Sequence, residues 1–436
     1  MPTLPLSRSM SIDPIAVLDW LGSQKQSPRL YWASRNGNFE FGGYGAALAV
    51  AARDASESGT KWLELESHLH GREEGQGPWF IGGCSFDPLS TDDPLWAGFP
   101  PLWFGIPRVS IVRQLDRYTL TVSEPERDGT HRADLLKALQ ADLDGVSLKT
   151  SPFEEVPFPE ILSRFDLPDL PGWIDNVKRS LDEIDRRNVE KIVLARRTDL
   201  LFSSPTDPFT FLSHLMRKNR NCFAFLLEPR RGKAFLGVTP ERLFRTNGRE
   251  ITSEAISGTT ANDGIDPEGP PADGFSLYSE KNLLEHRYVL EDITKRVRSL
   301  CTTIHAPAHR SAYELSNVSH IYCRISGQLK EGISLSEIIS ALHPTPAVGG
   351  TPREKALPLV RELDPFARGW YAAPVGIVGP HQADMAVAIR SAIVEGARVS
   401  LFAGAGIVSG SSPDTEWQEL EQKIAHAIEG LSGVLL

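Results

Sequence analysis

Residues 402–423 read FAGAGIVSGSSPDTEWQELEQK, and this stretch predicts a strand, a turn and an amphipathic helix in succession. Ser412 suits the N-cap of that helix, and Pro413 suits its first position. The helix carries one apolar stripe, formed by Trp417, Leu420, Ile424, Ile428 and Leu431. A strand that leads directly into such a helix near the end of the chain is the most informative local pattern in the sequence.

The polar face of this helix is a candidate functional site. Glu416, Glu419 and Lys423 each precede a member of the apolar stripe, so they share an adjacent face. Such a triplet is most often a solvated face with one Glu–Lys pair. Gly404, Ala405 and Gly406, however, lead into the helix without a bulky side chain. They permit close backbone approach to a carboxylate ligand, although a tight turn alone would explain them.

Upstream of this stretch, residues 386–393 read AVAIRSAI and predict a strand that is buried on both faces. Arg390 lies within it, and a buried guanidinium is costly unless it is paired. Two partners are open: a carboxylate of the chain itself, or a substrate carboxylate held bidentately.

Further charged residues lie at the ends of apolar segments. Lys191 begins the strand KIVLAR, and Glu241 follows the Thr239–Pro240 turn. Each is most often a surface charge, but a desolvated lysine can serve as a base and a confined glutamate as an acid. Glu285 on the long helix and Glu419 on the last one would together offer oxygen ligands that suit Mg²⁺.

The remaining sequence predicts an α+β fold. Residues 1–150 contain short β-rich runs, and residues 151–171 contain five prolines and predict a connection that crosses the surface. Residues 172–436 show sharper helix and strand patterns. Strands joined by both hairpins and helices indicate antiparallel sheets flanked by helices.

Composition excludes several classes of protein. The 436 residues carry a net charge of −10, which argues against nucleic acid or an anionic membrane as a partner. Four cysteines without a CxxC pair indicate reduced thiols, and neither a signal peptide nor a membrane span is apparent. We therefore expect a soluble, cytoplasmic protein, with a local positive cluster if its ligand is an anion.

The motifs together resemble the chorismate-utilising enzymes, a family that includes anthranilate, aminodeoxychorismate, salicylate and isochorismate synthases. The matching stretches, in order, are LARR (194–197), GVTPERLF (237–244), ISGTT (256–260), LLEHRYVLEDI (283–293), LHPTPAVGG (342–350), DPFARGWYAAPVG (364–376), AIRSA (388–392) and residues 402–423. The N-terminal third matches more weakly, chiefly at GPWFIGGCSFDP (77–88). The resemblance implies one large α+β domain with two antiparallel sheets packed between helices, in which residues 172–436 form the catalytic core.

Within that family, single residues favour isochorismate synthase. Lys191 stands where the ammonia-using branch has glutamine, and the loop at 256–259 lacks the lysine of aminodeoxychorismate synthases. Ala347 and Ile389 replace the threonines of salicylate synthases, and LHPTPA resembles the isochorismate branch. Asn282 departs from the family, whose members often have an acidic residue there.

The resemblance also implies a role for each site residue. Lys191 would activate a water for attack on C2 of chorismate, and Glu241 would protonate the departing C4 hydroxyl. Mg²⁺ would be bound by Glu285 and Glu419, with Glu416 acting through water. The residues expected around the substrate are Gly258, Thr259, His343, Ala347, Tyr371, Ile389, Arg390, Gly404, Ala405, Gly406 and Lys423.

Three alternatives remain open. A salicylate synthase would make isochorismate and then eliminate pyruvate in the same pocket. A non-catalytic chorismate-binding protein would have lost its base, acid or metal ligands, all of which are present here. An ammonia-fed synthase subunit conflicts with Lys191. We expect a monomer that serves menaquinone, siderophore or salicylate biosynthesis.

Overall fold

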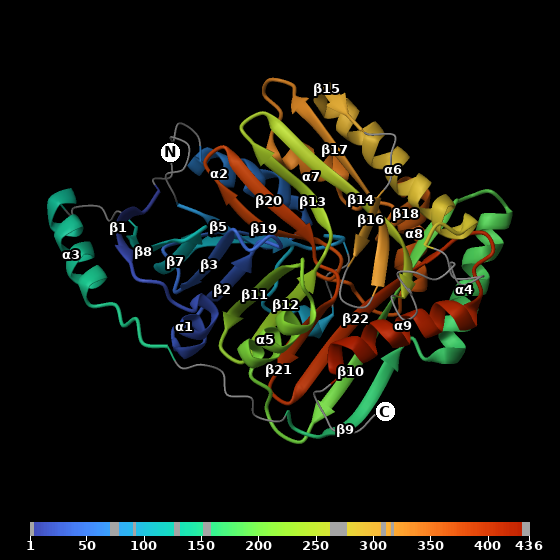
Figure 1. The fold of residues 1–436 in the computed structure, drawn as a ribbon, viewed down its shortest axis with the longest axis horizontal. Helices are drawn as coiled ribbons and strands as arrows, with labels where there is room; N and C mark the ends of the chain where they lie inside the picture. The colour runs from blue at the N-terminus through green and yellow to red at the C-terminus, as the bar shows by residue number, and fades with distance from the viewer. Residues whose placement is uncertain are drawn as a thin grey trace, which may run out of the picture.

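Two antiparallel sheets form the centre of the molecule, and helices pack around them (Figure 1). The computed structural model describes residues 4–69, 78–89, 93–125, 131–150, 158–261, 277–306, 311–314 and 318–429. This architecture confirms the predicted α+β fold, in one large domain.

Over the described residues, the first sheet has 12 strands and joins distant parts of the chain. Its order is β1 (Leu6–Ile12), β8 (Arg117–Glu124), β7 (Val109–Gln114), β3 (Phe39–Tyr44), β2 (Arg29–Ala33), β11 (Phe223–Arg230), β12 (Lys233–Thr239), β21 (Ser391–Glu395), β22 (Arg398–Ile407), β10 (Lys191–Phe202) and β18 (Gly350–Thr351), with β9 (Ile161–Leu167) also paired to β10. The N-terminal strands join the rest through the β2–β11 pair, in which Tyr31 lies opposite Leu226.

The second sheet has 10 strands within the same described ranges. Its order is β15 (Cys301–His305), β17 (Val318–Leu329), β14 (Glu250–Ala261), β13 (Arg242–Asn247), β20 (Gln382–Val387), β19 (Pro374–Gly379), β5 (Phe80–Cys84), β6 (Leu102–Ile106) and β4 (Leu48–Ala52), with β16 (Ser311–Glu314) paired to β17. Here, too, N-terminal and C-terminal strands are neighbours, because β5 pairs with β19.

The helices surround these sheets. In chain order they are α1 (Val17–Ser23), α2 (Ser58–Leu69), α3 (Arg132–Asp144), α4 (Leu170–Asp185), α5 (Pro208–Lys218), α6 (Glu280–Leu300), α7 (Leu335–Leu342), α8 (Arg353–Leu363) and α9 (Pro413–Ile428). Helix α6 packs on β14 and β17, whereas α9 packs on β22 and α4. No helix in the described ranges is both long and apolar enough to cross a membrane.

An aromatic cluster fills part of the core beneath β22. The ring of Trp96 stacks on Phe402 with centroids 5.5 Å apart, and Phe235 contacts Trp96, Phe99 and Trp370 edge-on. All five residues are buried. Each buried aromatic side chain contributes about 1.5–3 kcal/mol of hydrophobic stabilisation, and this cluster fixes the strand that leads to α9.

Two segments differ from the sequence-based expectations. Residues 161–167, within the predicted proline-rich connection, form strand β9 and pair with β10. The predicted single strand at 386–393 is wrong: β20 ends at Val387 in the second sheet, and β21 begins at Ser391 in the first. Arg390 lies between them with φ 50°, so the chain changes sheets at this residue. An apolar run alone does not reveal such a crossing, because both halves are buried.

Candidate active site

A cavity of about 590 Å³ is lined by residues from both sheets and from α5, α6 and α9. It brings together segments that are far apart in the sequence. The predicted site residues that line it are Glu241, Gly258, Glu285, Ala347, Tyr371, Ile389, Arg390, Gly404, Gly406, Glu416, Glu419 and Lys423. A volume of this size suits a small-molecule ligand.

Lys191, the first residue of β10, is not itself among the residues that line the cavity, but it lies directly behind Glu285, which is. Its side chain is fully buried, and Nζ donates to Oε1 of Glu285 at 2.8 Å. A Cβ at Gly406 would lie 2.8 Å from Cε of Lys191 and 3.0 Å from Oε1 of Glu285. Only a glycine on the neighbouring strand therefore leaves room for this ion pair.

Glu241 occupies the turn through which the chain passes from β12 in the first sheet to β13 in the second. It is 4% exposed, and its backbone nitrogen donates to Oγ1 of Thr239 at 3.3 Å. Burial raises the pKa of Glu241 to about 8, although the charge of Lys191 and the hydroxyl of Thr345 oppose the shift. The carboxyl group is therefore protonated at neutral pH and can donate a proton.

Three carboxylates of the cavity each pair with a lysine. Besides the Lys191–Glu285 pair, Lys281 donates to Oε1 of Glu416 at 2.6 Å, and Lys423 donates to Oε1 of Glu419 at 2.6 Å. Burial and the charge of Glu419 raise the pKa of Glu416. Negative charge is thus concentrated where α6 meets α9, and ammonium groups balance it.

This donor set fits Mg²⁺ in kind, because three carboxylates from two helices face one cavity. Burial opposes a rise in the pKa of Lys281, but the charges of Glu416, Glu419 and Glu285 raise it. One cation thus already experiences the field of all three carboxylates. In the described part of the chain, no three acidic, histidine or cysteine side chains stand in a ready-made metal-binding arrangement. A metal ion would therefore replace lysine contacts at these carboxylates.

Arg390 faces the same cavity and is half-buried. Its described hydrogen bonds go to neutral groups: Nη1 donates to Oδ1 of Asn219 at 3.5 Å, and Nη2 lies 3.4 Å from Nε2 of His320. Within the described ranges, no ion pair joins it to a carboxylate. Burial lowers the pKa of Arg390. Of the two partners left open by the sequence, an anionic ligand therefore fits this guanidinium better than an internal carboxylate.

His320 supports Arg390 as a neutral ring. Burial and the charge of Arg390 lower the pKa of His320 to about 3. Its Nδ1 lies 3.3 Å from the carbonyl oxygen of Gly258, so a proton on Nδ1 leaves Nε2 to accept from Arg390. This contact fixes the guanidinium without neutralising its charge.

Lys423 and Tyr371 frame the glycine-containing strand. Nζ of Lys423 donates to the carbonyl oxygen of Gly404 at 2.7 Å, and a Cβ at Gly404 would lie 2.8 Å from the hydroxyl of Tyr371. Tyr371 is buried and stacks on Phe402, with centroids 5.1 Å apart. Because strand residues alternate, Gly404 and Gly406 face the cavity, whereas Ala405 is buried on the opposite face.

Two other predicted residues differ in placement. His343 does not line the cavity: its Nε2 lies 3.1 Å from the carbonyl oxygen of Phe86, and the two rings contact edge-on. Burial lowers the pKa of His343 to about 4, so its ring is neutral. The structure describes the backbone of Thr259, but the side chain lies outside its described part.

Several polar residues of the cavity were not predicted from the sequence, among them Lys281, Asn219 and His320. Lys281 precedes Glu285 by four residues on α6, so helical spacing could have placed both on one face. Asn219 follows α5 and His320 lies on β17, and neither carries a local signal. Only the tertiary structure brings Asn219 and His320 to Arg390.

Comparisons with known proteins show which family the chain resembles. A family model described as "Chorismate binding enzyme" matches residues 4–432. The chain is 30% identical over 437 residues to isochorismate synthase MenF of Bacillus subtilis (strain 168), covering 97% of this chain and 92% of that protein. It is also 30% identical to isochorismate synthase MenF of Escherichia coli (strain K12), over 95% of this chain and 90% of the relative.

Solved structures show the same fold. The menaquinone-specific isochorismate synthase MenF from Escherichia coli superposes with a TM-score of 0.82 at 29% identity, covering 99% of this chain and 96% of that one. Anthranilate synthase component I from Streptococcus pneumoniae TIGR4 has a TM-score of 0.72 at 19% identity, over 94% of this chain and 93% of that one. The second likeness concerns the fold alone.

Proposed function

The chain belongs to the chorismate binding enzyme family, and we propose that it is a magnesium-dependent isochorismate synthase. One observation carries the proposal: a buried, protonated carboxyl group lines the cavity, and a buried lysine lies close behind the cavity wall, paired with Glu285. Lys191 is fully buried, and its charge acts on Glu241, whose pKa burial raises to about 8. A proton acceptor and a proton donor are therefore available on the same substrate.

The reaction exchanges one hydroxyl position for another without changing the composition of chorismate. Lys191 accepts a proton from a water as its oxygen bonds to C2. Glu241 gives its proton to the C4 hydroxyl, which leaves as water while the ring double bonds shift. General acid and general base catalysis each contribute about 10²–10⁴-fold. In the ion pair with Glu285, Lys191 is an ammonium group, so it must first release its own proton, and with it the ion pair, before it can accept one from water.

The remaining side chains bind the two substrate carboxylates. Arg390, Lys423 and Tyr371, with the backbone at Gly404, would hold the enolpyruvyl carboxylate. Mg²⁺, held by Glu285, Glu416 and Glu419, would neutralise and orient the ring carboxylate. A dianion can then enter a chain whose net charge is −10.

The pocket walls favour isochorismate over salicylate as the final product. Ala347 and Ile389 line the cavity with apolar side chains. Salicylate synthases usually have threonines at the corresponding places. We further propose that the enzyme is a monomer and that it is cytoplasmic. The reducing cytoplasm would keep its four buried cysteines as free thiols.

The test is incubation of the purified protein with chorismate and Mg²⁺, followed by chromatography of the products. We expect a mixture of chorismate and isochorismate, reached from either compound. Formation of salicylate and pyruvate would show that the protein is a salicylate synthase and would overturn the proposed activity. Absence of any conversion would overturn the proposal.

A matched pair of lysine variants tests the base. Lys191→Ala should abolish conversion but keep chorismate binding. Lys233→Ala is the control, because Lys233 is also buried at the start of a strand and pairs with Glu395 at 3.2 Å, away from the cavity. If Lys191→Ala keeps its activity, another group must take the proton.

A further inference from the structure

The turn that carries Glu241 is held on one side by the second sheet. Oγ1 of Thr239 donates to the carbonyl oxygen of Val387 at 2.7 Å, and the nitrogen of Val387 donates to the carbonyl oxygen of Glu241 at 3.0 Å. These bonds fix the backbone of Glu241 against β20. They leave the carbonyl group of Pro240, one residue earlier, to be held from elsewhere.

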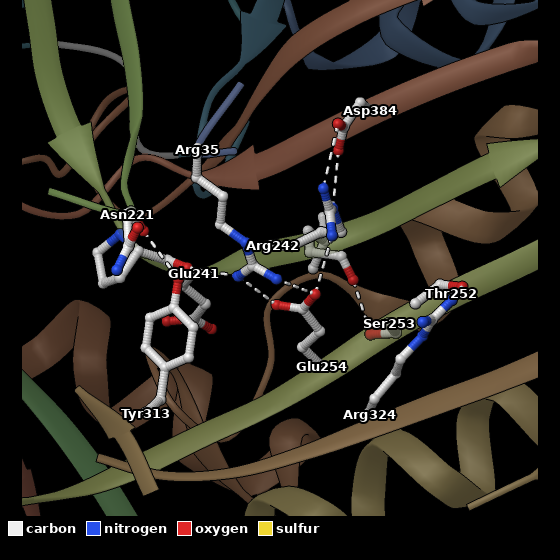
Figure 2. A network of polar contacts seen from close by, with 12 residues as sticks. Arg35, Asn221, Glu241, Arg242, Thr252, Ser253, Glu254, Tyr313, Arg324 and Asp384 are labelled. Atoms are coloured by element: carbon white, nitrogen blue, oxygen red, sulfur yellow. Dashed lines mark hydrogen bonds and ion pairs between the residues drawn. The ribbon is translucent and has the colours of Figure 1, made fainter. Parts of the chain in front are cut away.

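Arg35, from the N-terminal part of the chain, provides that second attachment. Its Nη1 donates to the carbonyl oxygen of Pro240 at 3.1 Å and to Oε2 of Glu254 at 2.7 Å. Nη2 donates to Oε1 of Glu254 at 2.5 Å. Figure 2 shows the Arg35 guanidinium between the turn that bears Glu241 and the carboxylate of Glu254.

The residue after Glu241 belongs to the same network. Arg242 donates to Oε1 of Glu254 at 2.9 Å and to Oδ1 of Asp384 at 2.9 Å (Figure 2). The chain neighbours of Glu241, Pro240 and Arg242, thus belong to one network of two guanidinium groups and two carboxylates whose charges balance. The side chain of Glu254 is only 1% exposed, and that of Arg35 is 14% exposed, so solvent screens these contacts weakly.

A tight turn between β2 and β3 fixes Arg35 itself. The nitrogen of Gly37 donates to the carbonyl oxygen of Ser34 at 3.0 Å, and Gly37 has φ 70°, which favours glycine. The guanidinium carbon also lies 5.2 Å from the ring centre of Tyr313 and 5.5 Å from that of Phe223. Arg35 therefore has one defined position, and it is not among the residues that line the cavity.

We propose that Arg35 is a positioning residue for Glu241, acting through its bonds to Pro240 and Glu254. This inference rests on the proposed function, in which Glu241 donates the proton. Arg35 contacts the cavity wall only from behind, at Pro240, and does not line the cavity, so its loss should misplace the acid without removing a substrate contact. A displacement of about 1 Å at a reacting group can cost about 10²-fold in rate.

The experiment compares kcat and KM for chorismate among the wild type, Arg35→Met, Arg35→Lys and Arg113→Met. Arg113 is a matched control: it donates to Oε2 of Glu40 at 2.9 Å and to the carbonyl oxygen of Gly37 at 2.7 Å, at the same turn, but does not reach Pro240. We expect Arg35→Met to lower kcat about 10- to 100-fold and to change KM less than about threefold. Arg35→Lys should recover part of kcat, and Arg113→Met should keep the wild-type value.

The outcomes separate the two proposals. A wild type that makes no isochorismate overturns the proposed function. An active wild type with unchanged kcat in Arg35→Met, or with equal losses in Arg35→Met and Arg113→Met, overturns only the role of Arg35. A rise in KM as large as the fall in kcat would also overturn the role of Arg35. If Arg35→Met does not fold, Arg35→Lys decides: one ammonium group cannot bridge Glu254 and Pro240 as the guanidinium does, so a wild-type kcat contradicts the inference.

Discussion

Glu241 shows how the surroundings of a single side chain define its chemistry. Its carboxyl group is buried in a turn, and burial raises its pKa to about 8, against the opposing effects of Lys191 and of the Thr345 hydroxyl. A glutamate with an ordinary pKa would be ionised at neutral pH and could not donate a proton. The same residue type at Glu419 has its pKa lowered by Lys423, although burial opposes that shift. The two carboxyl groups are therefore suited to different tasks, proton donation and cation binding.

The raised pKa of Glu241 predicts how activity depends on pH. Only the protonated group can act as the acid, so kcat should fall as the pH rises through about 8. Thr345→Val removes a hydroxyl that lowers this pKa, so the decline should move to higher pH. The measurement is kcat from pH 6 to about 10 at saturating chorismate and Mg²⁺. Glu241→Gln should have a low kcat that does not fall further as the pH rises. If kcat of that variant still falls as in the wild type, the pH dependence belongs to another group.

Gly406 is a second residue with a definite steric requirement. A methyl group there would overlap the Lys191–Glu285 ion pair, with Cβ 2.8 Å from Cε of Lys191. We expect Gly406→Ala to lower kcat at least about 10-fold, because the base is displaced. Gly59→Ala on α2 is the control, since its Cβ would meet no atom within 4 Å. Steady-state kinetics on both variants checks this, and full activity in Gly406→Ala would show that the pair tolerates displacement.

At the level of elements, α9 connects the core with the candidate metal ligands. Its N-cap is Ser412, whose Oγ accepts from the nitrogen of Thr415 at 3.2 Å, as the sequence predicts. The apolar face packs on β22 and α4, and the polar face carries Glu416 and Glu419 into the cavity. The start of the helix thus determines where both carboxylates lie.

Loss of this cap should weaken both stability and metal binding. Ser412→Ala is expected to lower the free energy of unfolding by about 1 kcal/mol and to raise the Mg²⁺ concentration needed for half-maximal activity. Ser334→Ala is the control, because Ser334 caps α7, which carries none of the predicted metal ligands. Urea denaturation and Mg²⁺ titration of both variants provide the measurements. Equal metal requirements in the two variants would contradict a link between the cap and the site.

Elements with strong local signals could be predicted from the sequence. The sequence predicts α9 and the long helix α6 because apolar residues recur in them at helical spacing, and a proline at the start of α9 supports that prediction. The prediction of one strand over 386–393 was wrong, because alternation and burial do not show which sheet a strand joins. No glycine marks the crossing at Arg390, which has φ 50° despite its side chain. Strand β9 was missed because its side chains are only partly buried or exposed, so it shows no strong apolar pattern, and because it follows several prolines.

Over the whole molecule, the two sheets combine strands from both ends of the chain. Arg29 on β2 pairs with Glu228 on β11 in a buried ion pair, and its Nη2 donates to Oε1 at 2.9 Å. The candidate site depends on similar long-range contacts: Lys191 meets Glu285, and Arg390 meets Asn219 and His320. Local sequence patterns do not encode such pairs. They offered Glu285 as a possible oxygen ligand, but only the family resemblance implied which residues share one site.

The buried ion pair predicts a global effect on stability. Arg29→Met leaves the carboxylate of Glu228 buried without its guanidinium, which should cost about 3–5 kcal/mol. Because the pair joins strands of one sheet, fluorescence and circular dichroism should report the same urea transition. Arg108→Met removes partly exposed ion pairs with Glu124 and Asp142 and should cost less than about 1 kcal/mol for each pair. Two separate transitions in Arg29→Met would mean that the N-terminal strands unfold on their own.

The crossing of the chain between the sheets has a consequence for how the enzyme can change. Lys191 begins a strand of the first sheet, whereas Glu241 lies where the chain enters the second. The packing of the two sheets against each other therefore sets the distance between the proposed proton acceptor and the proposed proton donor. Substitutions of packing residues such as Phe235 or Trp370, which do not line the cavity, would then change the chemistry by altering that distance.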